Sequence, residues 1–392
     1  MSKPWAMVLI VSALYPQVAL AQPPVRRFDD SGAPPFTVLK AGENPPLDVD
    51  GNFVIGPEYT PAPARKAVEG VAHGRVTQFT IDSKETKLFN PGIARQAFGK
   101  VDPANSKTLI VETHPIDYKR QITVYVPVQY QAGSEAPFMV CHDGPKDRPN
   151  SQLPQILDNL IAQKRIPPMI AIQIGNGGQD AQGSQRGKEY DAVNGVYTQF
   201  VEREVLPLVE KNAGVKLTRN PDGRASLGLS SSGAAAFTMA WFHPELYRRV
   251  LAYSPTMVNQ QWPYDPALRG GAWEYHSPWA GPAGPNLHVK NPGNAITPGD
   301  PAAAPLIPSV PAKPIRFWFA VGDQDLFYPN PVMVDGMHDW VLAAELMAKV
   351  LADKGYHYQF VFARNSKHVD RPTVAQTLPA ALEWLWKGYP LP

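Results

Sequence analysis

The chain has 392 residues, of which 44% are hydrophobic, and its 37 basic and 35 acidic side chains give a formal net charge of +2. This near balance argues against nucleic acid or an anionic membrane surface as the main partner. A chain of this length can bury a large core, and its single cysteine, Cys141, excludes an intramolecular disulfide. Cys141 stands in an apolar run, so we expect it to be a small buried side chain.

The first 21 residues have the pattern of a secretory signal peptide. Lys3 precedes an apolar stretch at residues 5–14, and the small residues Ala19 and Ala21 come just before Gln22. This order predicts export to the periplasm or the exterior after cleavage near Ala21-Gln22, and the apolar stretch is too short to span a membrane. An uncleaved anchor is the alternative.

Residues 22–107 are rich in proline and only intermittently periodic. Short apolar runs at residues 53–57 and 76–81 are typical of strands between long loops. Because few periodic apolar positions are available for a separate core, we expect an extension packed on the following domain, residues 108–392. An independent binding module is the alternative.

Beyond residue 108, apolar β-branched runs alternate with amphipathic segments. The alternation predicts an α/β fold with a mainly parallel, eight-stranded sheet and helices on both faces, whose first strands form an antiparallel edge. The expected strands are 109–111, 122–126, 138–141, 169–174, 225–229, 250–253, 315–321 and 358–362, and the expected helices are near 153–164, 197–212, 234–242, 341–354 and 374–386.

One long irregular segment, residues 262–314, lies before the seventh expected strand. It is rich in proline, glycine and alanine but carries several aromatic residues, among them Trp273 and Trp279. Its position would place it over the carboxyl ends of the strands, as a lid or a substrate wall whose rings stack on the ligand. Aromatic anchors that hold the loop down are the alternative.

The most informative motif is the run from Gly228 to Gly233, which follows the strand at 225–229 and opens a helix of small residues. A strand, a sharp turn and a helix with a serine at the apex expose that serine as a nucleophile, and we assign this role to Ser230. The turn needs small residues two positions before and after the serine, which Gly228 and Ser232 supply, although glycine is usual at the second position. A serine-rich helix N-cap is the alternative.

A nucleophilic serine needs a histidine to take its proton and a carboxylate to orient that histidine. Behind such a turn the acid comes next along the chain and the histidine last. Asp323 and Asp325 both follow the strand at 315–321; Asp325 is our choice and Asp323 the competitor. His368 is the histidine that follows the final strand, with a surface loop histidine as the alternative reading.

Two backbone N–H groups are expected to bind the oxyanion, one of them from Ser231, the residue after the nucleophile. The other should come from the loop after the strand at 138–141. Pro145 has no N–H, so the donor there is Gly144, with Lys146 as the alternative.

Four further residues are candidates for substrate binding. His142 and Asp143 either line the pocket or brace the turn that follows their strand. Arg186 and Glu189, in a predicted loop, either bind substrate or form an internal ion pair that holds this loop.

At these residues the chain resembles a family of α/β-hydrolases that includes enterochelin esterase, esterase D and the feruloyl and acetyl-xylan esterases of carbohydrate esterase family 1. The resemblance covers about residues 108–388 and implies the α/β-hydrolase fold and ester hydrolysis. N-terminal and C-terminal pieces are similar to a bacterial exported branch of that family. The matching motifs are Asp143-Gly144, Arg186 with Glu189-Tyr190, the run from Gly228 to Gly233, Gly322 to Leu326, and His368.

These observations together predict an exported serine carboxylic-ester hydrolase that works through an acyl-enzyme. The expected substrates are small acyl or aromatic esters, including carbohydrate-linked ones, with siderophore or lactone esters as the second choice. No metal or cofactor is expected, because H-E-x-x-H, paired C-x-x-C and G-x-x-x-x-G-K-[ST] motifs are missing from the sequence. The alternatives are an acyltransferase with the same triad and a catalytically silent carbohydrate-binding homologue that uses the aromatic insertion. The sequence does not determine the oligomeric state.

Overall fold

The computed structural model describes residues 35–97, 100–102, 105–145, 148–178, 183–260, 271–278, 304–326 and 337–391. Residues 1–21 with their predicted cleavage site, Trp279 and most of the segment 262–314 lie outside these ranges. Within the ranges, no helix is long and apolar enough to cross a membrane.

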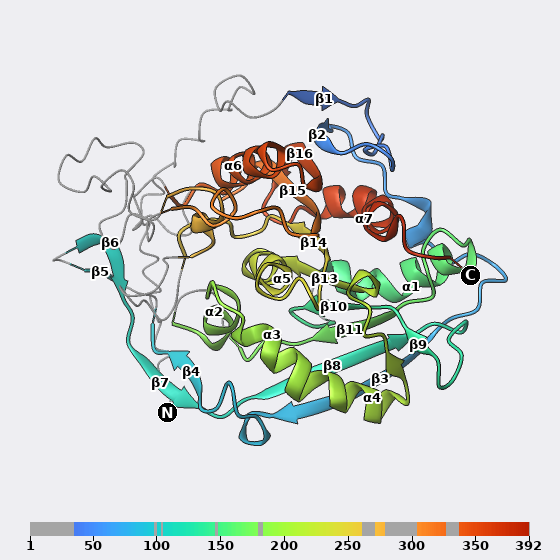
Figure 1. Ribbon diagram of the computed structural model, residues 1–392, viewed down its shortest axis with the longest axis horizontal. Helices are drawn as coiled ribbons and strands as arrows, with labels where there is room; N and C mark the ends of the chain where they lie inside the picture. Colours follow the sequence, from blue (N-terminus) through green and yellow to red (C-terminus); the bar gives the residue numbers. More distant parts are fainter. Residues whose placement is uncertain are drawn as a thin grey trace, which may run out of the picture.

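A ten-stranded sheet forms the centre of the fold, in the order β1-β2-β16-β15-β14-β13-β10-β11-β8-β3 (Figure 1). Neighbouring strands are parallel from β1 through to β11, whereas β8 is antiparallel to β11 and β3 is antiparallel to β8. The strands of this sheet are β1 (Phe36–Val38), β2 (Gly51–Ile55), β3 (Arg75–Asp82), β8 (Lys119–Val126), β10 (Phe138–His142), β11 (Ile170–Ile174), β13 (Arg224–Leu229), β14 (Arg249–Tyr253), β15 (Arg316–Gln324) and β16 (His357–Lys367).

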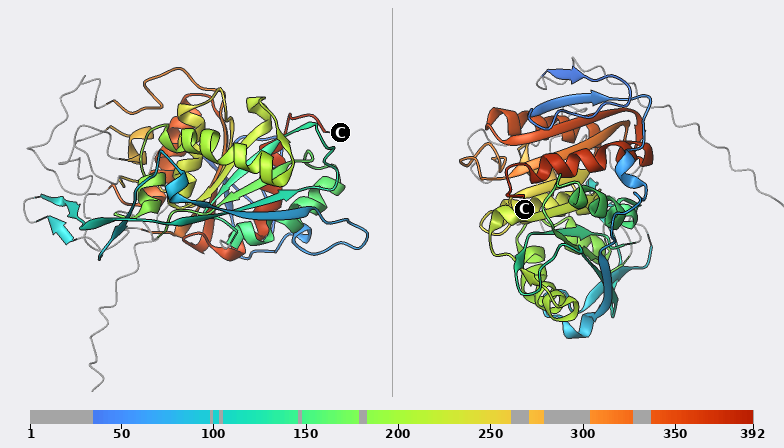
Figure 2. Two further views of the ribbon diagram at one scale, coloured as in Figure 1. Left: turned by 90° about the horizontal axis from the view of Figure 1, so that it is seen from below. Right: turned by 90° about the vertical axis from the view of Figure 1, so that its right-hand side faces the viewer.

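Helices cover both faces of this sheet (Figure 2), which confirms the predicted α/β class. The residues of α1 and α7 belong to one buried apolar cluster, and those of α3 to α6 belong to the other. The helices are α1 (Arg148–Ala162), α2 (Gln185–Tyr190), α3 (Val196–Phe200), α4 (Leu206–Ala213), α5 (Ser231–Phe242), α6 (Trp340–Asp353) and α7 (Arg371–Trp386), with a π-helical turn at Val201–Val205 and 3₁₀ turns at Pro63–Arg65, Ser83–Glu85, Pro221–Gly223 and Ala272–Tyr275.

The central strands are apolar on both faces, as a sheet covered by two helical layers requires. In β10, Phe138 and Val140 belong to one buried cluster, whereas Met139 and Cys141 belong to the other. This alternation follows the two-residue period of a strand. Cys141 is fully buried, which confirms the prediction for it, and burial raises the pKa of its thiol.

The segment before residue 108 is integrated into the sheet more deeply than the sequence predicts. β1 and β2 extend the sheet beyond β16, while β3 extends it beyond β8 at the opposite edge. Phe36 of β1 packs edge-on against Phe360 and Phe362 of β16, with ring centroids 5.7 and 6.0 Å apart. The prediction of an extension packed on an eight-stranded sheet is therefore corrected, because strand pairing at both edges binds this segment into a sheet of ten strands.

The expected strand at 109–111 is misplaced. The structure has β6 (Asn105–Ile110) paired with β5 (Lys100–Asp102) in a separate two-stranded sheet. This pair lies at one end of the molecule, away from the main sheet (Figures 1 and 2). A run of three apolar residues indicates a strand but carries no information about its partner. The remaining short pairs are β4 (Gly92–Arg95) with β7 (Thr113–Ile116), and β9 (Glu135–Ala136) with β12 (Lys216–Leu217).

Candidate active site

Ser230 lies on a strained turn between β13 and α5. Its backbone angles, φ 56° and ψ −127°, are in a region that non-glycine residues rarely adopt. The Ser230 N–H donates to the Tyr253 carbonyl at 3.0 Å, and the Ser230 carbonyl accepts from the Thr256 N–H at 3.0 Å. The Ser230 hydroxyl lies 3.4 Å from the Thr256 hydroxyl. Backbone bonds to the loop after β14 thus hold the serine at the start of α5.

Small residues around the serine make this turn sterically feasible. A Cβ atom on Gly228 would lie 1.9 Å from the backbone oxygen of Ser232, so only glycine fits there. Ser232, which stands where glycine is usual, folds its side chain back onto the strand. Its hydroxyl accepts from the Leu229 N–H at 2.7 Å and donates to the Leu229 carbonyl at 2.8 Å. The departure from the usual motif is therefore compensated by two local hydrogen bonds.

The loops after β15 and β16 bring an aspartate and a histidine together. Because β13, β14, β15 and β16 are parallel neighbours, the loops that follow them meet at the carboxyl edge of the sheet. There the Nδ1 atom of His368 lies 2.5 Å from the Oδ1 atom of Asp325. The Asp325 side chain is fully buried, whereas that of His368 is 24% exposed. A buried carboxylate thus orients a histidine that remains accessible from solvent.

Asp323, the competing acid, has a different partner. Its Oδ1 atom accepts a hydrogen bond from the Ser366 N–H at 3.1 Å and braces the end of β16. Within the described part of the chain, Asp325 is the aspartate that pairs with His368.

Ser254, which the sequence analysis did not single out, connects the aspartate to the histidine loop. Its hydroxyl donates to Asp325 Oδ2 at 2.6 Å and accepts from the Val369 N–H at 2.9 Å. Ser254 is buried and has a positive φ of 46°. The available signal was its position, since it is a polar residue directly after the buried strand β14 at the edge where Ser230 was expected.

Asp143 and Arg186 form a buried ion pair beside the serine turn. The Nε and Nη2 atoms of Arg186 donate to the two carboxylate oxygens of Asp143 at 2.8 and 2.9 Å, and Nη2 also reaches the Leu229 carbonyl at 3.3 Å. Burial by itself raises the pKa of Asp143, but the charge and hydrogen bonds of Arg186 outweigh burial and lower that pKa. This pair ties the loop after β10 to the residue that precedes Ser230.

Glu189 pairs with a residue that the sequence analysis missed. Its carboxylate accepts two hydrogen bonds from the Arg120 guanidinium, at 2.5 and 2.9 Å, and both side chains are almost fully buried. Arg186 and Glu189 therefore form two separate ion pairs, and not the mutual pair considered from the sequence. They lie on α2, where the sequence predicted a loop, because Ser184 caps this helix by accepting from the Gly187 N–H at 3.0 Å.

His142 is fully buried at the end of β10, among aromatic rings. Its Nδ1 atom lies 3.1 Å from the Tyr197 hydroxyl, and its ring contacts Tyr190 and Tyr197 at centroid distances of 5.7 and 5.4 Å. Burial lowers the pKa of His142 to about 4, so this histidine is neutral at physiological pH.

Gly144 lies in the turn that follows β10, with a φ of 70°. A Cβ atom there would lie 3.1 Å from the Gly175 Cα atom, so the loops after β10 and β11 approach each other closely. Ser231 is the first residue of α5, and the Gln260 side chain donates to its hydroxyl at 3.3 Å. Lys146, the alternative donor, lies outside the described residues.

Trp273, in the described part of the insertion, is 2% exposed and stacks edge-on against His276 at 4.9 Å. Tyr275 is also buried and packs against Phe237 of α5, with ring centroids 5.0 Å apart. Both aromatic side chains belong to the same buried apolar cluster as α5, so they hold the insertion against the domain. Among the described residues, no three His, Cys, Asp or Glu side chains form a group that could hold a metal ion.

Comparison with known proteins gives one family and a set of structural likenesses. The family model described as "Putative esterase" matches residues 113–385. No curated protein matches the chain. The enterobactin esterase FES from Shigella flexneri, solved with 2,3-di-hydroxy-N-benzoyl-serine, is 18% identical with a TM-score of 0.45, covering 69% of this chain and 56% of that one, so this chain spans about half of its length. The ferulic acid esterase AmCE1/Fae1A from the anaerobic fungus Anaeromyces mucronatus is 14% identical with a TM-score of 0.46, covering 84% of this chain and 96% of that one.

Proposed function

We propose that this chain, which belongs to the putative esterase family matched over residues 113–385, cleaves carboxylic esters with Ser230 as nucleophile. The observation that carries the proposal is the hydrogen bond between His368 and the buried Asp325, at the sheet edge that also bears the serine turn. Serine, acid and histidine then act in the order of a serine hydrolase triad.

In the first half-reaction the Ser230 hydroxyl attacks the ester carbonyl carbon while His368 takes its proton. Asp325 occupies the Nδ1 side of the imidazole, so Nε2 is the nitrogen left to accept this proton. The buried carboxylate stabilises the imidazolium that forms. His368 then donates the proton to the departing alkoxide, which leaves as an alcohol and gives an acyl-serine.

Negative charge develops on the carbonyl oxygen during this attack. The N–H of Ser231 supports its stabilisation because it belongs to the first residue of α5, where unpaired N–H groups and the helix dipole favour an anion. We assign the second donor to Gly144, whose positive φ lets the turn after β10 approach the site closely. Buried contacts hold the loops around the site in position. They are those of His142 with Tyr197, of Asp143 with Arg186 and of Glu189 with Arg120.

In the second half-reaction a water molecule attacks the acyl-serine. His368 takes a proton from that water and returns it to Ser230, which releases a carboxylic acid and restores the enzyme. We propose small acyl or aromatic esters, including carbohydrate-linked ones, as the substrates. We also propose export after cleavage near Ala21, which the signal-like N-terminal sequence supports.

The test is hydrolysis of a short panel of esters by the wild type and by Ser230→Ala. The panel holds p-nitrophenyl acetate and butyrate, methyl ferulate, acetylated xylo-oligosaccharide and a sugar lactone. We expect kcat/KM to fall by roughly a thousandfold or more in Ser230→Ala. Ser134→Ala, which removes an exposed turn hydroxyl, is the control and should keep full activity.

A folded Ser230→Ala protein that keeps its activity would contradict the mechanism. Analysis of the products shows whether the acyl group is transferred to water or to a sugar. Hydrolysis gives the free acid even when a sugar acceptor is present, whereas an acyltransferase would give the acylated sugar.

A further inference from the structure

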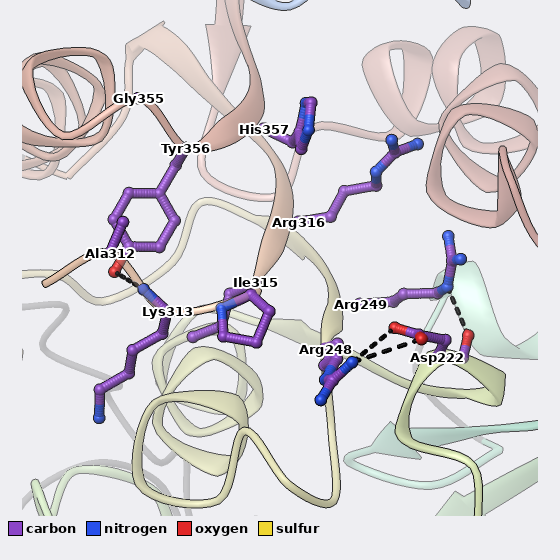
Figure 3. Close-up of a pocket in the computed structure, with 11 residues that line it drawn as sticks. Asp222, Arg248, Arg249, Ala312, Lys313, Ile315, Arg316, Gly355, Tyr356 and His357 are labelled. Carbon is purple, nitrogen blue, oxygen red and sulfur yellow. Dashed lines mark hydrogen bonds and ion pairs between the residues drawn. The ribbon is translucent and has the colours of Figure 1, made fainter.

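A second concave site lies at the edge of the sheet opposite the serine turn. A cavity of about 240 Å³ is lined by the first residues of three parallel strands, Arg249 of β14, Arg316 of β15 and His357 of β16 (Figure 3). Parallel strands have their amino ends on the same side of a sheet, and Ser230 follows the carboxyl end of β13. The length of the strands therefore separates this cavity from Ser230. Its volume far exceeds the roughly 15 Å³ that a cavity needs to hold one water molecule.

Cationic side chains outnumber carboxylates in this cavity. Arg248, Arg249, Lys313 and Arg316 line it together with a single acidic residue, Asp222. Both carboxylate oxygens of Asp222 lie 3.3 Å from the Nη1 atom of Arg248. The only carboxylate of the lining is therefore already engaged by one arginine.

Arg249 and Arg316 lie side by side at the end of α7. Their Nη1 atoms both donate to the Lys387 carbonyl, at 3.1 Å from Arg249 and 3.4 Å from Arg316. Arg249 also donates to the Leu385 carbonyl, and Arg316 donates to the Trp384 carbonyl at 2.8 Å. No carboxylate in the described part of the chain forms an ion pair with either. The C-terminal end of a helix supplies about half a negative charge, which is less than the two guanidinium charges.

This arrangement leaves both charge and hydrogen-bonding capacity unmatched. Arg249 is 8% exposed, and burial together with the charge of Arg316 lowers its pKa to about 10. The Nη2 atom of Arg249 and the Nε and Nη2 atoms of Arg316 have no hydrogen-bond partner among the described residues. Burial lowers the pKa of Arg316, and the charge of Asp50 offsets this only in part. Asp50 is itself hydrogen-bonded to His357 at 2.7 Å.

We propose that this cavity binds a small tetrahedral oxyanion, a phosphate or sulfate group. Two adjacent guanidinium groups with spare N–H donors match such an anion, because each can offer a pair of parallel hydrogen bonds to its oxygens. The excess of more than one positive charge favours a dianion over a carboxylate. The anion would relieve the repulsion between Arg249 and Arg316 and stabilise the end of α7.

The test measures thermal unfolding of the full chain in inorganic phosphate and in sodium sulfate, against sodium chloride of equal ionic strength. A ligand that binds the native state raises the melting temperature by mass action, by about 3 °C for this chain length at a hundredfold excess over Kd. We expect phosphate and sulfate to raise it and chloride to leave it unchanged. An equal rise in chloride would overturn the proposal.

Arg316→Gln removes one guanidinium and should abolish the anion-specific rise. Lys349→Gln is the matched control, since it also removes one positive charge but from an exposed pair with Asp353 on α6. Should Arg316→Gln not fold, Arg248→Gln replaces it, because Arg248 is partly exposed and its loss should weaken phosphate binding in calorimetry at least tenfold. Undiminished binding by the folded cavity variant would show that the anion binds elsewhere, such as at the serine turn.

A further arm compares inorganic phosphate with glucose 6-phosphate at equal concentrations. A larger rise with the sugar ester would identify a phosphomonoester as the preferred ligand, and a smaller rise would identify the free anion. Both results support an oxyanion site. If neither compound raised the melting temperature of the wild type above its value in sodium chloride, the proposal would be rejected.

Discussion

The arginines at the two ends of the parallel strands, which we call the carboxyl edge and the amino edge of the sheet, differ in their partners. At the carboxyl edge, Arg186 binds both oxygens of Asp143 beside the serine turn. At the amino edge, Arg249 and Arg316 share the Lys387 carbonyl and have no carboxylate partner within the described chain. A matched charge fixes the position of its neighbours, whereas an unmatched charge costs stability until a ligand neutralises it.

The comparison shows that the two ends of the parallel strands carry sites of different kinds. The carboxyl edge is preorganised for chemistry, because its buried polar groups hold one another in place around Ser230. The amino edge presents spare donors and excess charge, which suits the capture of an anion. Changes at either edge test this contrast.

The largest expected effect comes from the acid of the proposed triad. Asp325→Asn should lower kcat by about 10⁴-fold, because an amide no longer holds the imidazole in the required tautomer or stabilises its charge. Steady-state kinetics on an ester found active in the panel will measure this loss. Asp323→Asn is the matched control and should change kcat by less than about threefold, since Asp323 binds the Ser366 N–H. Comparable losses in the two variants would contradict the assignment.

The next effect concerns the free energy of unfolding at the two edges. Glu189→Gln leaves the Arg120 guanidinium buried without a counter-charge and should cost about 3–5 kcal/mol. Asp222→Asn breaks the half-exposed pair with Arg248 and should cost less than about 1 kcal/mol. Urea denaturation measures both. Equal losses of unfolding free energy in the two variants would contradict the inferred difference between the carboxyl edge and the amino edge.

The buried, neutral His142 at the carboxyl edge predicts that the free energy of unfolding depends on pH. Burial lowers the pKa of His142 to about 4, below the unfolded value near 6.5, so the unfolded chain binds the proton more readily. Its contribution is fully present above pH 6.5 and is lost as the pH falls toward 4. Between pH 7 and 5 the loss should be about 2 kcal/mol. His142→Phe should flatten the wild-type curve over this range by that amount, and an unchanged curve would show that His142 does not titrate as inferred.

The smallest effect tests Ser254 as a positioning residue. Ser254→Ala removes the hydroxyl that joins Asp325 to the Val369 N–H and should lower kcat about tenfold while KM stays constant. Ser366→Ala, which removes a buried hydroxyl bonded to Thr373, is the control and should leave kcat unchanged. A change in KM alone would indicate that Ser254 shapes substrate binding and not the orientation of the acid.

Local sequence patterns predicted most strands of the main sheet and the residues of the candidate site. The alternation of apolar runs predicted neither the pairing of the strands nor the outermost strands of the sheet. It did identify seven strands of the main sheet, β8, β10, β11, β13, β14, β15 and β16, because strand periodicity depends on near neighbours. The serine turn was visible for the same reason, since the steric demand at Gly228 arises within five residues. The positions of Asp325 and His368 followed from the strands before them.

Only the tertiary structure decided which groups meet. The pairing of β2 with β16 and of β3 with β8 joins segments far apart in the chain, and so does the bond between Asp325 and His368. The partners of Arg186 and Glu189 were equally hidden, because ion pairs depend on three-dimensional distance and burial. The basic cavity has no sequence motif, since its residues come together only when parallel strands align their amino ends.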